Sequence, residues 1–152
     1  MNQLCIEPDQ VISTLNRLIE LNRDGQKSFQ EAAGKMAAPH LKTYCFKQSR
    51  SHAHFVGELQ TLVHSLGDEP DNGGTVLGAL HRGWMELRSA LGGGDQAILA
   101  ATETFENFAR NKFRDALNVY LPTDVRDIVE RQFASVKQTI DTIKELRSSL
   151  PQ

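Results

Sequence analysis

Residues Leu41–Leu66, LKTYCFKQSRSHAHFVGELQTLVHSL, decide the fold, because their inward-facing positions change character halfway along. Steps of alternately four and three residues select one seam: Leu41, Cys45, Gln48, His52, Phe55, Leu59, Leu62 and Leu66. This spacing is typical of a helix that packs among other helices. The two ends of the seam are apolar, whereas Gln48 and His52 place hydrogen-bonding groups where a bundle normally has leucine. We therefore expect either a polar layer in the core or a bound ligand at this level.

A helix over residues 8–36 precedes this one and faces it. Its apolar repeat also has polar or missing side chains at its centre: Val11, Leu15, Leu18, Asn22, Gly25, Phe29, Ala32 and Met36. The break at Ala37–Pro39 predicts an antiparallel hairpin. Counting outward from that turn places Asn22 level with about residue 53, so the two polar zones share one layer. Glycine costs about 1 kcal/mol against alanine inside a helix, so Gly25 indicates close backbone approach or a local kink.

A long connection follows this first hairpin. Residues 67–74 are dense in turn-forming types, and Thr75 is placed to cap a shorter helix over residues 76–91 that ends at Gly92–Gly94. Trp84 lies on the apolar face of that helix, where it either anchors the helix on the bundle or forms an interface hot spot. A single short helix within a long connection predicts a crossover that runs along the bundle.

The C-terminal half predicts a second hairpin, with helices over residues 95–120 and 123–150. Asp95 and Thr123 are placed as their N-terminal caps. The apolar face of the first of these helices comprises Ile98, Ala101, Phe105, Phe108, Ala109, Phe113, Ala116 and Tyr120. Two antiparallel hairpins joined by a crossover with a short fifth helix form an all-α, ferritin-like four-helix bundle, since an up-and-down bundle needs only short loops. We expect residues 1–152 to form this single domain.

Charge and apolar patterning exclude two classes of partner. The 17 Lys and Arg residues against 19 Asp and Glu residues give a net charge of −2, and no basic run or aromatic-interleaved basic face predicts nucleic-acid binding. No apolar run approaches the roughly 20 residues of a membrane span, and the first residues lack the features of a secretory signal. We therefore expect a soluble, cytoplasmic protein. Cys5 and Cys45 lie far apart, and we expect two free thiols.

The predicted topology can be compared with that of dimetal carboxylate bundles. In those proteins two helices each supply one glutamate, and the other two each supply a Glu-x-x-His pair. This chain has candidate ligands on all four long helices: Glu20 or Asp24, His54, Glu103 or Glu106, and Glu130. Each paired motif is half complete, because Ser51 stands where a glutamate should precede His54 and Phe133 stands where a histidine should follow Glu130.

Two interpretations of the polar centre follow. In the first, the site is degenerate and no cofactor is expected: His52 is a core histidine hydrogen-bonded to Asn22 or Gln48, and the glutamates of the third and fourth helices are partly solvated or ion-paired. In the second, iron or manganese binds at an unconventional redox or storage site made of Asp24, His54, Glu103, Glu106 and Glu130. A histidine phosphotransfer bundle is disfavoured, because no lysine lies near His54 and His52 faces inward.

Several motifs are similar to motifs of a known family: Gly78–Trp84 (GALHRGW) with Leu87, Ala90 and Leu91, Asp24-Gly25 with Phe29, Ala32 and Ala33, Phe55 with Glu58-Leu59, Ile98–Ala100 with Glu103 and Glu106, and Val129–Gln132. On these residues the chain resembles, over nearly its whole length, a bacterial ferritin-like four-helix-bundle family of the rubrerythrin and ferritin type whose function is not established. By analogy, the resemblance implies metal or redox roles in bacterial stress physiology. With a degenerate site, we expect instead a structural or protein-interaction role in that physiology, with a homo-oligomer formed through exposed helix faces. The family pattern has an acidic residue near Ser51 and a histidine near Ile140, and this chain has neither.

Overall fold

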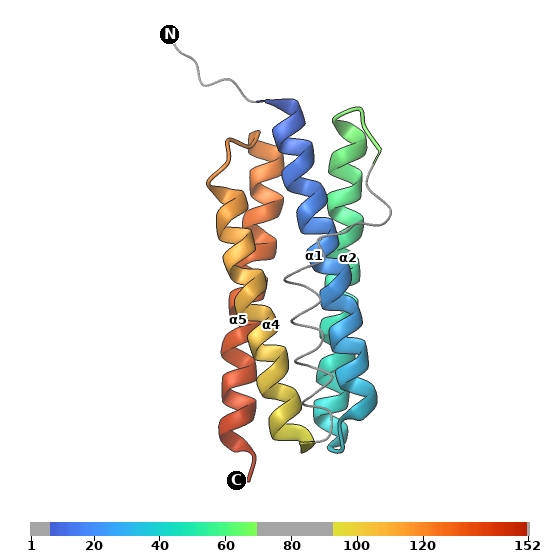
Figure 1. Cartoon of the computed structure of the whole chain (residues 1–152), viewed down its shortest axis with the longest axis vertical. Helices are drawn as coiled ribbons and strands as arrows, with labels where there is room; N and C mark the ends of the chain where they lie inside the picture. Colours follow the sequence, from blue (N-terminus) through green and yellow to red (C-terminus); the bar gives the residue numbers. More distant parts are fainter. Residues whose placement is uncertain (1–6, 70–92, 152) are drawn as a thin grey trace.

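The computed structural model describes residues 7–69 and 93–151, which form four α-helices and no β-strand (Figure 1). The helices are α1 (Pro8–Lys35), α2 (Pro39–Ser65), α4 (Gly94–Leu117) and α5 (Thr123–Ser149). The prediction of an all-α, four-helix fold is confirmed. The predicted crossover and its helix over residues 76–91 lie outside the described residues. None of the described helices combines the length and apolar character that a membrane span requires.

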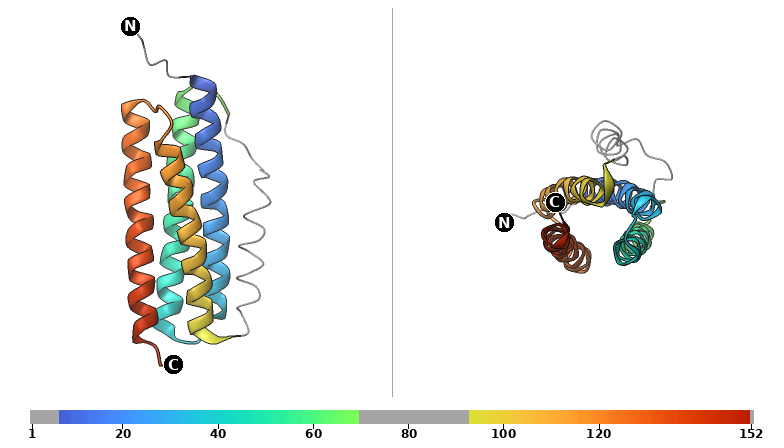
Figure 2. Two further views of the ribbon diagram at one scale, coloured as in Figure 1. Left: turned by 60° about the vertical axis from the view of Figure 1, so that its left-hand side comes forward. Right: turned by 90° about the horizontal axis from the view of Figure 1, so that it is seen from below.

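The four helices form two antiparallel hairpins, α1 with α2 and α4 with α5 (Figure 1). The hairpins pack together mainly through α1 and α4, whereas the contact between α2 and α5 is much smaller. Seen along the bundle, the helices follow one another around an arc in the order α2, α1, α4, α5 (Figure 2). α2 ends where α1 begins, and α4 begins at the opposite end of the bundle (Figure 1).

Local sequence explains where the first hairpin begins and turns. Pro8 and Pro39 occupy the first positions of α1 and α2, where a proline has no helical hydrogen bond to lose. Asp9 lies in the first turn of α1 and Lys35 in its last, each at the end of the helix dipole that its charge stabilises. The two helices are therefore separated by three residues only, and the hairpin is tight.

The sequence predicted Asp95 as the N-terminal cap of α4, and this prediction is wrong. Asp95 is the second residue of that helix, and its carboxylate accepts hydrogen bonds from the backbone N–H groups of Ala37, at 2.8 Å, and Ala38, at 2.9 Å. The start of α4 is thereby fastened to the turn between α1 and α2. The prediction for Thr123 is also wrong, because Pro122 occupies the cap position of α5 and Thr123 is its first helical residue.

Two apolar clusters fill the bundle, one toward each end. The first includes Leu15, Ile19, Leu59, Phe113 and Val129, and the second includes Phe29, Leu41, Cys45, Ile98 and Ile143. Between them lies a set of buried polar side chains that we call the polar layer: Asn22, Gln48, His52, Glu106, Gln132 and Thr139. The predicted change of character along α2 is therefore a property of the whole bundle. Tyr120, predicted to face inward, follows the end of α4 and is 53 % exposed.

Candidate functional site

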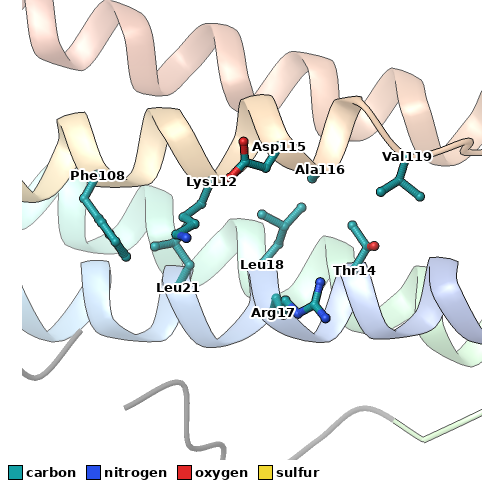
Figure 3. Close-up of a pocket in the computed structure, with 9 residues that line it drawn as sticks. All are labelled: Thr14, Arg17, Leu18, Leu21, Phe108, Lys112, Asp115, Ala116 and Val119. Atoms are coloured by element: carbon teal, nitrogen blue, oxygen red, sulfur yellow. The ribbon is translucent and has the colours of Figure 1, made fainter. Parts of the chain in front are cut away.

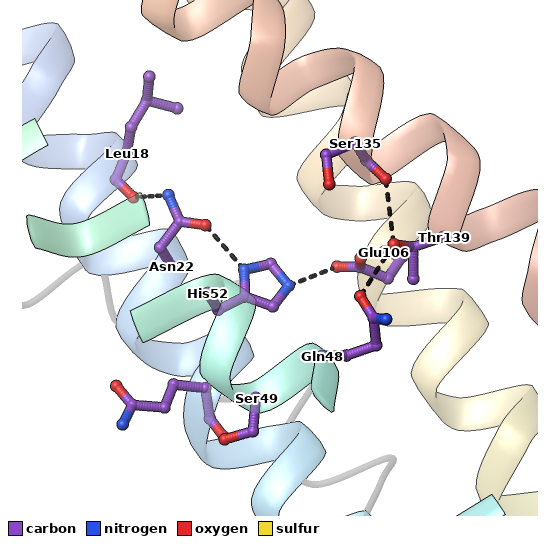
Figure 4. Close-up of polar contacts among 9 residues, drawn as sticks. Leu18, Asn22, Gln48, Ser49, His52, Glu106, Ser135 and Thr139 are labelled. Carbon is purple, nitrogen blue, oxygen red and sulfur yellow. Dashed lines mark hydrogen bonds and ion pairs between the residues drawn. The ribbon is translucent and has the colours of Figure 1, made fainter. Parts of the chain in front are cut away.

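His52 is the central side chain of the polar layer (Figure 4). It is 2 % exposed, and both of its ring nitrogens have partners on other helices. Its Nδ1 lies 2.7 Å from Oδ1 of Asn22 on α1, and its Nε2 lies 3.1 Å from Oε1 of Glu106 on α4. Of the two partners predicted for His52, Asn22 and Gln48, the structure shows a bond to Asn22. One imidazole therefore joins three of the four helices.

The hydrogen-bond pattern assigns the proton positions of this group. Nδ2 of Asn22 donates to the carbonyl oxygen of Leu18 at 2.8 Å, which leaves Oδ1 of Asn22 facing the imidazole (Figure 4). Since that oxygen can only accept, Nδ1 of His52 carries a hydrogen. The bond between Nε2 and Glu106 then contains one proton, either as imidazolium and carboxylate or as two neutral groups. In both forms the pair has no net charge, so Glu106 is buried without requiring a cation.

Aromatic rings and one glycine surround the imidazole. Phe29 stacks on it with ring centroids 5.7 Å apart, and Phe55 and Phe105 meet it edge-on at 6.0 and 6.3 Å. A Cβ at Gly25 would lie 2.8 Å from Cγ and Nδ1 of His52, closer than real Cβ atoms approach other atoms. The predicted close approach at Gly25 is therefore present, but the approaching group is the His52 ring rather than a backbone.

The remaining polar-layer residues join α5 to α2. Oγ1 of Thr139 donates to Oε1 of Gln48 at 3.1 Å, and Nε2 of Gln132 donates to Oε1 of Glu58 at 3.0 Å and to the carbonyl oxygen of Phe55 at 3.4 Å. Oε1 of Gln132 is buried and has no hydrogen-bond partner in the part of the chain that the structure describes. Polar side chains thus bridge α2 and α5, the neighbouring helices with the smallest contact in the bundle.

Two further titratable groups lie beside the layer and are held protonated. Burial raises the pKa of the Tyr44 phenol to about 12, and the Glu106 carboxylate contributes to the rise. Burial also raises the pKa of the Cys45 thiol to about 12, with a contribution from the charge of Asp95. Cys45 is a free thiol, as predicted, while Cys5 lies outside the described residues. A buried, protonated thiol is inert, so Cys45 is not a nucleophile at neutral pH.

Four of the five predicted metal ligands lie outside the polar layer, and only Glu106 belongs to it. The His54 side chain is 70 % exposed, and its Nε2 lies 3.6 Å from Oε2 of Glu58. Asp24 is partly buried on α1, where burial raises the pKa of its carboxyl and the nearby Lys27 partly opposes the rise. His52 and His54 of α2 thus face different surroundings, the first in the core and the second toward solvent.

The three predicted glutamate ligands have separate partners. Glu103 accepts a hydrogen bond from Nη1 of Arg147 at 2.7 Å, and Glu130 lies 3.7 Å from Nη1 of Arg126. Glu106, expected to be partly solvated or ion-paired, is 1 % exposed and pairs with His52, so the second of these two expectations holds. The spacing along α4 indicates this burial, because Glu106 lies four residues after Thr102 and three residues before Ala109, both of which are buried. Within residues 7–69 and 93–151, no three His, Cys, Asp or Glu side chains group to hold a metal ion.

The fold and the polar layer define the class of this protein as an all-α four-helix protein with a buried, hydrogen-bonded polar centre. Residues 10–119 match a family described as "Domain of unknown function (DUF2383)", and this match spans more than two thirds of the chain. The chain therefore belongs to the DUF2383 family. The match extends from α1 through α4 and includes both Asn22 and Glu106. None of the curated proteins compared with the chain matches it.

Proposed function

We propose that this protein is a ferritin-like bundle with a structural or protein-interaction role, in which the polar layer stands in place of a dimetal centre. The contact between His52 and Glu106 carries the proposal, because the one buried carboxylate of the layer is already satisfied by a histidine. Two divalent ions need several carboxylates to compensate their charge in a core of low dielectric. One such carboxylate does not fit a dimetal group.

Three further features belong to the same proposal. Residues 70–92 are taken as the crossover between the hairpins, because α2 ends and α4 begins at opposite ends of the bundle (Figure 1). The protein is taken as cytoplasmic, with a role in bacterial stress physiology. A homo-oligomer formed through exposed helix faces is the expected assembly, and light scattering of the purified protein over a range of concentrations tests it: a monomer at every concentration would contradict it.

Metal loading tests the central claim. The purified chain is incubated with iron(II) or manganese(II) without oxygen, desalted, analysed for bound metal, and then exposed to oxygen in an electrode chamber. We expect substoichiometric metal and oxygen consumption no faster than in a buffer control. Stoichiometric, tightly held metal together with oxygen consumption would overturn the proposal.

A second candidate is an iron- or manganese-binding protein with an unconventional carboxylate and histidine site. It is favoured by the 3.1 Å separation of Nε2 of His52 and Oε1 of Glu106, which suits two atoms bound to one ion at about 2.0–2.2 Å. Asn22 holds the other ring nitrogen, as the outer partners of metal-bound histidines do. An ion would have to displace the shared proton, so uptake would release acid. If this candidate holds, His52→Gln abolishes metal uptake and Asp127→Asn, on the exposed face of α5, leaves it unchanged.

A further inference from the structure

A pocket of about 270 Å³ lies between α1 and α4, toward the end of the bundle where α1 begins (Figure 3). Apolar side chains from α1, from α4 and from the residue after its cap form most of the lining: Leu18, Leu21, Phe108, Ala116 and Val119. Leu18, Leu21 and Ala116 are buried, so the inner wall belongs to the packed interior. A cavity of about 150 Å³ with an apolar lining is already large enough to bind benzene. This pocket therefore has room for a small apolar group.

Charged side chains stand at the edge of the same pocket. Arg17 on α1 and Lys112 on α4 are exposed, and Asp115 lies one turn beyond Lys112 (Figure 3). The Lys112 ammonium is 5.3 Å from the centre of the Phe108 ring, and both side chains line the pocket. Among the ion pairs of the described residues, none involves these three groups. Two cations and one anion leave the mouth with one net positive charge.

We infer that this pocket binds a small amphipathic anion, with its apolar chain or ring against Leu18 and Leu21 and its carboxylate between Arg17 and Lys112. An apolar wall with a few polar groups at one side is the usual composition of small-molecule sites, and such sites occur between the helices of bundles. The net positive charge at the mouth selects a monoanion over a neutral or cationic molecule of the same shape. The pocket is separate from the polar layer, so this inference does not depend on the proposed function.

The inference is tested by titrating octanoate into the isotope-labelled 152-residue chain. Binding is measured by the amide chemical shifts and, separately, by calorimetry. We expect one saturable site with shifts concentrated on the facing parts of α1 and α4. Arg17→Gln and Lys112→Gln should each weaken octanoate binding about fivefold, because one partly exposed charge contact contributes about that much to affinity. Arg114→Gln removes the same charge from α4 outside the pocket lining and should bind octanoate as the unmodified chain does. Octanol, which has the same tail without the charge, should bind at least several-fold more weakly.

Three results would overturn the inference. The first is non-saturable binding or shifts scattered over all helices, and the second is binding that neither Arg17→Gln nor Lys112→Gln weakens although circular dichroism shows both variants folded. The third is a set of nuclear Overhauser contacts, without octanoate, between the methyl groups of Leu18 and Leu21 and side chains of residues 70–92. That result would show that another part of the chain fills the pocket.

Discussion

Replacing Gly25 with alanine is expected to destabilise the protein, although the same change stabilises most helices. Gly25 lies inside α1, where the added Cβ would be 2.8 Å from two atoms of the His52 ring. The ring cannot retreat freely, because Phe29 stacks against it and Asn22 and Glu106 hold both of its nitrogens. The matched control is Gly57→Ala in α2, where an added Cβ meets no atom within 4 Å.

The change in the free energy of unfolding caused by Gly25→Ala is the sum of one favourable and two unfavourable contributions. Alanine gains about 1 kcal/mol over glycine inside a helix. At Gly25 this gain is opposed by overpacking, about 1–3 kcal/mol. If the His52 ring is displaced, the buried groups of Asn22 and Glu106 lose their partner, which costs about 1–3 kcal/mol. We therefore expect Gly25→Ala to lower the free energy of unfolding by roughly 1–5 kcal/mol and Gly57→Ala to raise it by about 1 kcal/mol.

Urea unfolding followed by far-ultraviolet circular dichroism measures both variants. A second comparison adds His52→Ala, which removes the ring that the new Cβ would meet. In that background the Gly25→Ala change should cost nothing and should recover its helical gain, so the two substitutions are strongly non-additive. The reasoning is refuted if Gly25→Ala is as stable as Gly57→Ala, or if the effects of Gly25→Ala and His52→Ala simply add.

Three other outcomes are expected. Asp95→Ala should lower the free energy of unfolding by about 2 kcal/mol in urea, because two N–H groups lose a charged acceptor, whereas the exposed Asp127→Ala should change it little. In a Cys5→Ser background, alkylation of Cys45 should be about a thousandfold slower in the folded than in the urea-unfolded chain, since its pKa rises from 9.0 to about 12; equal rates would contradict the burial of the thiol. The unfolded chain releases the Cys45 and Tyr44 protons first, so the free energy of unfolding should fall as pH rises above about 9, and a flat alkaline profile would contradict this linkage.

Helical periodicity was sufficient to predict which faces are buried. The seam through Asn22 and Gly25 on α1 and the seam through Gln48 and His52 on α2 are buried along nearly their whole length. Counting residues outward from the turn at Ala37–Pro39 also placed the two polar zones at one level, because antiparallel helices with a short connection keep a fixed relation between their residue numbers. The periodicity of the sequence therefore predicted the buried face of each of these two helices and the level of the polar layer.

The partners within the layer could not be read in the same way. The sequence places Glu106 beside the apolar residues of α4, but the partner of its carboxylate, the imidazole of His52, depends on the position of α2. Asp95 has the residue type and place of a helix cap, but a hairpin distant in sequence presents two N–H groups to the same oxygens. Both residues follow local rules, and tertiary packing chooses between the partners that those rules allow.

We expect the polar layer to act on the specificity of the fold more than on its stability. A buried polar pair is often no more stabilising than apolar residues of equal volume, whereas loss of one partner is costly. Here His52 joins α2 to α1 through Asn22 and to α4 through Glu106, while Thr139 joins α5 to α2 through Gln48. A slip of any helix by one turn would bury these groups unpaired, so the layer fixes the register of the bundle. Joint replacement of Asn22, His52 and Glu106 by leucine should therefore retain the unfolding temperature but give several sets of amide signals in the NMR spectrum. A single well-dispersed set of amide signals would contradict this role of the polar layer.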